Sequence, residues 1–231
     1  MRSLIMLVVG LGACLMAPSL PAQELTILNF DGFLYESDNT SGAIGFPPSD
    51  PGDVLAGVGL INGMSSPLTW STTTHQYTRV MGGLESAGAF DLGNGDLLIV
   101  YAGGTLDIIA QPYADAGYTS PDYGVEPPNA TAPSTFADGS LYLHGEFTGF
   151  TLYYNAITHT GQYEGNLNFS LGSNLGDLEN PSGYTFAGLV DATGAITVPT
   201  GYDFEAVGHV HFDPTIPTLD ATWGGVKNLY R

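Results

Sequence analysis

Hydrophobic and polar residues alternate with a period of two along much of the chain, which is typical of strands with one face on a core and the other in solvent. The clearest case is residues 163–171, and residues 141–147 and 204–212 show the same alternation. Residues 97–101 are apolar throughout, and this predicts a central strand covered on both faces. The chain is therefore expected to be rich in half-buried strands.

Glycine and proline divide the sequence into strand-length pieces. There are 32 Gly and 15 Pro, and the longest stretch without either after residue 22 is residues 68–81, which is dominated by β-branched and aromatic types. Further strands are predicted at residues 24–33, 54–61, 104–109 and 184–190. About ten strands are more than one small sheet holds without curling or splitting, so we expect an all-β fold, an antiparallel two-sheet β-sandwich of jelly-roll type.

The C-terminal residues have a different pattern. Thr222 can cap a helix in which Trp223, Val226 and Tyr230 share one face, with Lys227 near the end that favours cations. We therefore expect a short C-terminal helix.

The first residues have the pattern of a bacterial export signal. A basic start is followed by an apolar run too short to span a bilayer and by small residues at 17–22, so residues 1–22 are predicted to be a signal peptide and residues 23–231 one domain, secreted, periplasmic or on the cell surface. The less favoured alternative is a lipoprotein anchored at Cys14. No transmembrane segment is expected in the mature chain.

Charge limits the classes of partner. The formal net charge is −19, and it becomes −20 when Arg2 leaves with the signal peptide. The three cations that remain cannot neutralise a phosphate backbone, so a nucleic-acid partner is not expected. Cations are better candidates, and a soluble, self-repelling surface is the simpler interpretation of the charge.

A metal site is one candidate for the chemistry of this chain. His209 and His211 are two apart on a predicted strand, which places both imidazoles on one face about 7 Å apart. The alternative is an ordinary hydrated face. Further ligands would come from Glu205 or Asp213 on the same face, or from His144 or Glu146 on another strand.

Calcium is the second candidate ion, because two loops are rich in the carboxylate oxygens that it prefers. The acids concerned are Asp38, Asp50 and Asp53 in one loop and Asp115, Asp122 and Glu126 in the other. Aspartate is also a common turn residue, so loop geometry alone explains them equally well.

Catalysis has little support in the sequence. The motifs of serine hydrolases and zinc peptidases and the phosphate-binding glycine loops are absent, and the single cysteine lies in the signal segment. The alternative function is a secreted carbohydrate-active enzyme of the glycoside-hydrolase type, with paired carboxylates drawn from Glu146, Glu164 and Glu205.

Aromatic residues on outward faces or loops would favour binding of a polysaccharide or another cell-surface component, since a flat ring can stack on a sugar. The candidates are Trp70, Tyr142, Tyr153 and Tyr202.

Four segments resemble a group of uncharacterised secreted β-rich bacterial proteins that often carry a PEP-CTERM sorting tail. They are residues 52–59 with the following Trp70, residues 76–84, residues 101–108 and residues 136–145. The tail itself is absent, since there is no Pro-Glu-Pro, terminal apolar helix or arginine cluster. The resemblance implies export and a β-rich fold, and it implies no catalytic residues. The leading expectation is a non-catalytic extracellular or envelope protein that binds calcium or polysaccharide; an outer-membrane barrel is a third alternative.

Overall fold

Strands form where the alternating pattern predicts them. The computed structural model describes residues 24–37, 46–47, 49–115, 117, 120–123 and 134–212. Its strands are β1 (Leu25–Ser37), β2 (Val54–Met64), β3 (His75–Gly93), β4 (Asp96–Ala102), β5 (Thr105–Pro112), β6 (Ser140–Asn155), β7 (Thr160–Leu171), β8 (Tyr184–Asp191) and β9 (Phe204–Phe212). Two short 3-10 helices, η1 (Ser134–Phe136) and η2 (Leu175–Asp177), lie between them.

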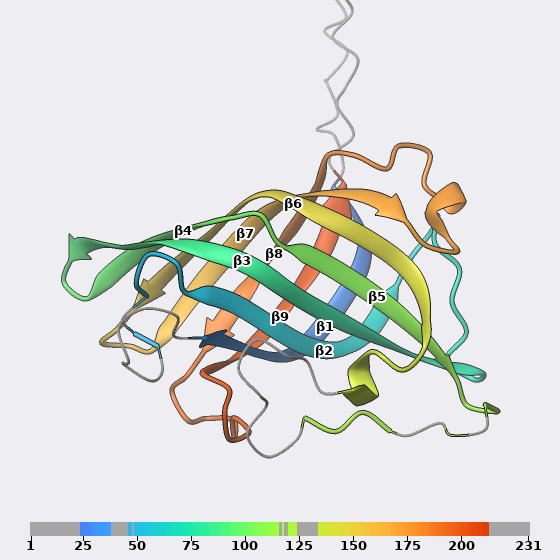
Figure 1. The fold of residues 1–231 in the computed structure, drawn as a ribbon, viewed down its shortest axis with the longest axis horizontal. Coiled ribbons are helices and arrows are strands. Elements are labelled where there is room, and N and C mark those ends of the chain that lie inside the picture. Colours follow the sequence, from blue (N-terminus) through green and yellow to red (C-terminus); the bar gives the residue numbers. More distant parts are fainter. Residues whose placement is uncertain are drawn as a thin grey trace, which may run out of the picture. The chain divides into compact units, whose positions relative to one another are not determined.

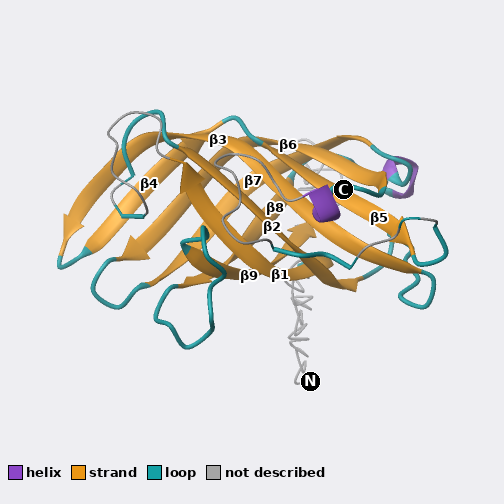
Figure 2. Ribbon diagram, turned by 60° about the horizontal axis from the view of Figure 1, so that its bottom comes forward, coloured by secondary structure: helices purple, strands orange, loops and turns teal. Residues whose placement is uncertain are grey.

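All nine strands belong to one antiparallel sheet that closes on itself (Figures 1 and 2). Strand β1 pairs with β2 on one side and with β9 on the other, and β2 also pairs with β3. Strands β5 and β4 pair with successive halves of both β3 and β6, so together they fill one position. The result is an eight-position barrel in which neighbours in the chain are neighbours in space.

The predicted two-sheet sandwich is therefore wrong, although the all-β class is right. Strands of up to 19 residues twist and coil, and a sheet of this width can remove its exposed edges by closing instead of splitting into two layers. Eight positions leave an interior that side chains just fill. The predicted C-terminal helix at residues 222–231 lies outside the described residues.

Aromatic side chains fill the middle of the barrel. Tyr163, Gly188, Gly208 and Phe30 lie side by side in one row across β7, β8, β9 and β1. The Tyr163 ring occupies the space in which Cβ atoms on Gly188 and Gly208 would stand, and its hydroxyl donates to the Val207 carbonyl at 3.2 Å. These two glycines are therefore required by the close approach of the ring.

The alternation correctly identifies most inward-facing residues. Tyr163, Leu167 and Phe169 of β7 are buried, as are alternate residues of β9. The prediction for residues 97–101 is wrong, because β4 has only one covered face and Val100 is 38% exposed on the other. No helix in the described part of the chain is long and apolar enough to cross a membrane.

A second apolar cluster lies on the outer face of β1 and β2, formed by Tyr35, Ala56, Val58, Phe136 and Tyr202. Two of these residues come from loops, and η1 is fixed there because the Thr78 hydroxyl donates to the Phe136 carbonyl at 2.7 Å. This part of the outer wall is thus covered by the chain itself.

Arg79 is the only Lys or Arg among the described residues, and it points into the barrel. Its side chain is fully buried and none of its three nitrogens has a hydrogen-bond partner. The guanidinium carbon lies 4.5 Å from the centre of the Phe30 ring and 6.0 Å from that of Phe186. Burial lowers the pKa of Arg79, because desolvation disfavours the cation. Stacking on the rings offsets only part of that cost.

We predict that Arg79→Met does not destabilise the barrel and raises its free energy of unfolding by about 1–4 kcal/mol. Methionine keeps the side-chain volume and the contact with Phe30 while removing the buried charge. Urea unfolding measures the difference. Arg79→Ala, which leaves a cavity, should instead destabilise by about 2–5 kcal/mol. A loss of stability in the methionine variant as large as in the alanine variant would contradict this interpretation.

Candidate metal centre

Two histidines, His209 and His211, lie on the outer face of β9, where this strand pairs with the first residues of β1. His211 is opposite Thr26, and His209 is opposite Asn29. A register shift between Thr26 and Leu28 marks a bulge in β1, just after its first residues. Because side chains two apart share a face, Glu24, directly before β1, lies on the same side as Thr26 and reaches both histidines.

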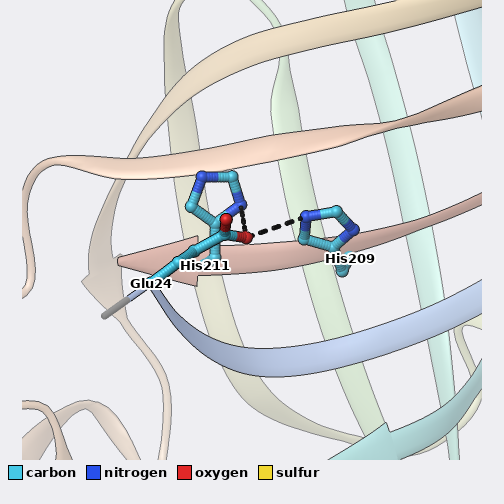
Figure 3. A group of neighbouring side chains, drawn as sticks. All are labelled: Glu24, His209 and His211. Carbon is cyan, nitrogen blue, oxygen red and sulfur yellow. Dashed lines mark ion pairs between the residues drawn. The ribbon is translucent and has the colours of Figure 1, made fainter. Parts of the chain in front are cut away.

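The three side chains converge on one point (Figure 3). Oε1 of Glu24 lies 3.3 Å from Nε2 of His209 and 3.2 Å from Nδ1 of His211. One ligand atom from each residue lies within 4.8 Å of the other two, and the rings are tilted by 33° with centres 5.0 Å apart. The His211 side chain is only 11% exposed, whereas those of His209 and Glu24 are 35% and 51% exposed. The group is thus anchored on one side and open to solvent on the other.

These separations suit a small tetrahedral ion. Zinc binds imidazole nitrogen and carboxylate oxygen at about 2.0–2.2 Å, so neighbouring ligand atoms of a tetrahedron are about 3.3 Å apart. The two distances from Glu24 already have this value. The remaining pair, between the histidine nitrogens, lies within 4.8 Å. Three protein ligands leave a fourth position for water.

The donor set also decides which metals fit. Two imidazoles and one carboxylate suit zinc, copper or nickel, and they do not suit calcium, which takes six to eight oxygens. This is the only group of at least three potential ligands of this kind in the described part of the chain. The arrangement therefore favours a transition-metal ion of the zinc type over calcium.

The two histidines lie together, as their spacing predicts, and the third residue of the group is Glu24, which no spacing in the sequence indicates. The other predicted ligands lie outside this group. His144 is hydrogen-bonded to Asp107 of β5, and Glu146 is opposite Asn168 on β7. Glu205 is opposite Asp191, four residues from His209 along β9. Asp213 lies outside the described residues. Only the pairing of β1 with β9 could have revealed Glu24, and no local pattern in the sequence encodes that register.

Among the acids predicted for calcium, Asp53 stabilises its own loop. The Asp53 carboxylate accepts from the Asp50 amide at 2.9 Å, and Asp53 is buried. Asp115 and Asp122 are exposed, and Asp38 and Glu126 lie outside the described residues. Within the described ranges, no three of these acids gather into a ligand group.

The three carboxylates of the enzyme alternative are on different strands, Glu146 on β6, Glu164 on β7 and Glu205 on β9. Glu164 and Glu205 line different, adjoining hollows of the outer surface, and Glu146 lines neither. The glycoside-hydrolase alternative thus stays a prediction.

The aromatic residues considered for sugar binding are mostly covered. Tyr142 and Tyr202 are buried, and the Tyr142 hydroxyl donates to the Thr69 carbonyl. Trp70 is half-buried against the core. Tyr153 is 37% exposed on the outer face of β6. Polysaccharide binding stays a prediction, and Tyr153 is the residue best placed for it.

A second polar group lies at the other end of β1 and is partly buried. The Glu36 carboxylate accepts from the hydroxyls of Ser49 and Tyr101, the latter at 2.8 Å. Asp203 accepts from the Glu36 amide at 2.8 Å and from the Phe46 amide at 3.3 Å. Burial raises the pKa of Glu36 to about 7 and also raises that of Asp203. This group fixes residues 46 and 49 against the barrel end, with Phe46 packed on Tyr154 and Phe204.

No protein-family model, curated protein or solved structure matches this chain. The function is therefore inferred from the geometry of the described residues.

We predict that Glu36 makes stability fall as the pH rises from about 4.5 to 7. The unfolded chain loses this proton near pH 4.5, whereas the folded protein keeps it until about pH 7. The stabilising contribution is complete below the lower value, and a shift of this size removes about 3 kcal/mol by pH 7. Urea unfolding of Glu36→Gln at a series of pH values should give a free energy of unfolding that falls less steeply with pH. The fall that remains comes from Asp203.

Tyr101→Phe is the matching comparison. It removes a hydrogen bond that lowers the pKa of Glu36, so the fall in stability should extend to higher pH. An identical pH slope in wild type and Glu36→Gln would show that this carboxyl titrates normally.

Proposed function

We propose that the protein is an exported, non-catalytic barrel in which a zinc-like divalent ion links the first strand to the last. The ligands are Glu24, His209 and His211, and the observation that supports this proposal is their convergence within hydrogen-bonding distance. The ion would occupy the closing seam, by which we mean the pairing of β1 with β9.

The position of the site explains what an ion would do there. Glu24, directly before β1, and His209 of β9 are 185 positions apart in the sequence (209 − 24), and the pairing of these two strands completes the barrel. An ion bound to both is held only by the folded chain, so its binding free energy adds to the stability of the barrel. Since residues 15–231 contain no cysteine, a disulfide cannot supply this link in the mature chain.

The export part of the proposal rests on the sequence of residues 1–22, with their basic start, apolar run and small residues. Outside the cytoplasm a small domain without disulfides depends on its core and on bound ions for persistence. The zinc-like ion takes the place of calcium in this proposal, because the described acids form no cage of oxygens.

We predict that Zn²⁺ raises the thermal midpoint of the wild-type protein, whereas Ca²⁺ at the same concentration does not. At 100 times the dissociation constant the gain is about 2.7 kcal/mol, which corresponds to about 5–10 °C for a domain of this size. EDTA should reverse the shift. Calorimetric titration should give one ion per chain.

His209→Ala should lose most of the zinc-dependent shift. His159→Asn is the matched control: His159 is an exposed histidine at φ 59°, a conformation that asparagine adopts readily, and it lies outside the ligand group. It should retain the full shift. An equal zinc effect in both variants would place the ion elsewhere, and no effect in wild type would leave Glu24 as an ion-pair partner only.

A further inference from the structure

Two adjoining hollows lie on the outer face of β6–β9. His209, which lines the second hollow, is the one residue that they share with the ligand group. Both are lined by Tyr153, Gln162, Leu189 and Val207, which we call the shared row. The first hollow, of 460 Å³, extends over Asn155, Thr160, Asp191 and Glu205; the second, of 520 Å³, extends over Thr151, Glu164, Ala187 and His209. Because they share one wall, we treat them as a single outer groove.

The strand register explains the composition of the outer groove. Tyr153, Gln162, Leu189 and Val207 are direct neighbours across four strands. Two residues away from the shared row on each strand, one neighbouring row contains Thr160, Asp191 and Glu205. The row on the opposite side contains Glu164, Ala187 and His209. The shared row, with three apolar residues and Gln162, is thus bordered by carboxylates on both sides, over about 15 Å across the strands and about 13 Å along them.

The two aliphatic residues of the shared row are exposed. Leu189 of β8 is 59% exposed, and its neighbour Val207 in the middle of β9 is 40% exposed. Val207 is also the one apolar residue on an otherwise polar face of β9. Exposed aliphatic side chains in contact with one another lower the free energy of a complex when a partner covers them.

The charge of the groove is negative and has no counter-ion from the described chain. Arg79 is buried on the other side of the sheet, so no described Lys or Arg lies on the outer surface. Burial, and then the nearby carboxylates of Asp191 and Asp31, raise the pKa of Glu205, since like charges oppose its ionisation. A cationic partner would relieve this repulsion.

We propose that the outer groove binds a cationic amphipathic segment of another polypeptide. Its apolar side chains would cover Leu189 and Val207, and its lysines or arginines would pair with Asp191, Glu205 and Glu164. A sugar chain is less suited to this surface. In the shared row, two of the three apolar residues are aliphatic, and the hydroxyl of its one aromatic residue, Tyr153, is hydrogen-bonded to Asp96.

Binding of synthetic peptides in EDTA tests this proposal without any involvement of the metal site. The probe is a peptide of four Leu-Lys repeats, compared with four Ser-Lys repeats and four Leu-Glu repeats, by calorimetry at low and moderate salt. The Leu-Lys peptide should bind at least about tenfold more tightly than either of the others, and should weaken as salt rises.

Surface variants locate the binding. Leu189→Asn combined with Val207→Asn should weaken the Leu-Lys peptide by about tenfold or more, and so should Asp191→Asn combined with Glu205→Gln. Leu171→Asn is the control, because Leu171 is equally exposed, at 58%, and lies outside the groove. Circular dichroism would verify that each variant is folded.

Three results would overturn the proposal. Equal affinity for the Ser-Lys and Leu-Lys peptides, unchanged in the groove variants, would mean attraction to overall charge. Binding of a glucosamine hexamer that depends on the groove, without binding of the Leu-Lys peptide, would make the site one for an amine-bearing sugar. Absence of binding by every probe would leave the groove without the proposed partner. None of these results bears on zinc binding.

Discussion

The structure depends on the pairing of its first strand with its last. Phe30 of β1 lies opposite Gly208 of β9, so the contact joins residues 178 positions apart (208 − 30). Without it the sheet would have two free edges, and the aromatic interior would be open to water on one side. The candidate metal centre depends on the same pairing, since it places Glu24 beside the histidines, whereas the outer groove lies on the adjoining pairings of β6 to β9.

Closure of the sheet also determines which residues the interior can accept. An eight-position barrel has little space at its axis, and the large Tyr163 ring fits because Gly188 and Gly208 have no side chain beneath it. The Phe30 and Phe186 rings stack at 4.7 Å, and Arg79 lies on them. The high glycine content, which suggests loops when read along the sequence, is therefore partly a packing requirement of an aromatic core.

The sequence predicts which face of a strand is buried better than it predicts how strands are joined. Alternation correctly identifies the inward residues of β7 and β9, because it reflects local geometry. It contains no information on the register between distant strands, so a curled single sheet and two stacked sheets were both compatible with it. The same limit applies to the site: His209 and His211 are apparent from their spacing, whereas Glu24 becomes their neighbour only through closure. The sequence around Arg79, which lies between Thr78 and Val80, does not indicate that its side chain faces inward.

The two proposed sites have His209 in common, and this connects them energetically. His209 is a ligand in the candidate metal centre, and it also lines one end of the outer groove. A divalent ion bound there would place positive charge at one end of an acidic groove and would oppose a cationic segment lying beside it. By linkage, the segment would weaken the metal by the same factor. The effect would fall with salt, because His209 is partly exposed and ions screen such a surface. Strand β9 would then bring metal and partner into competition, although each has its own contacts.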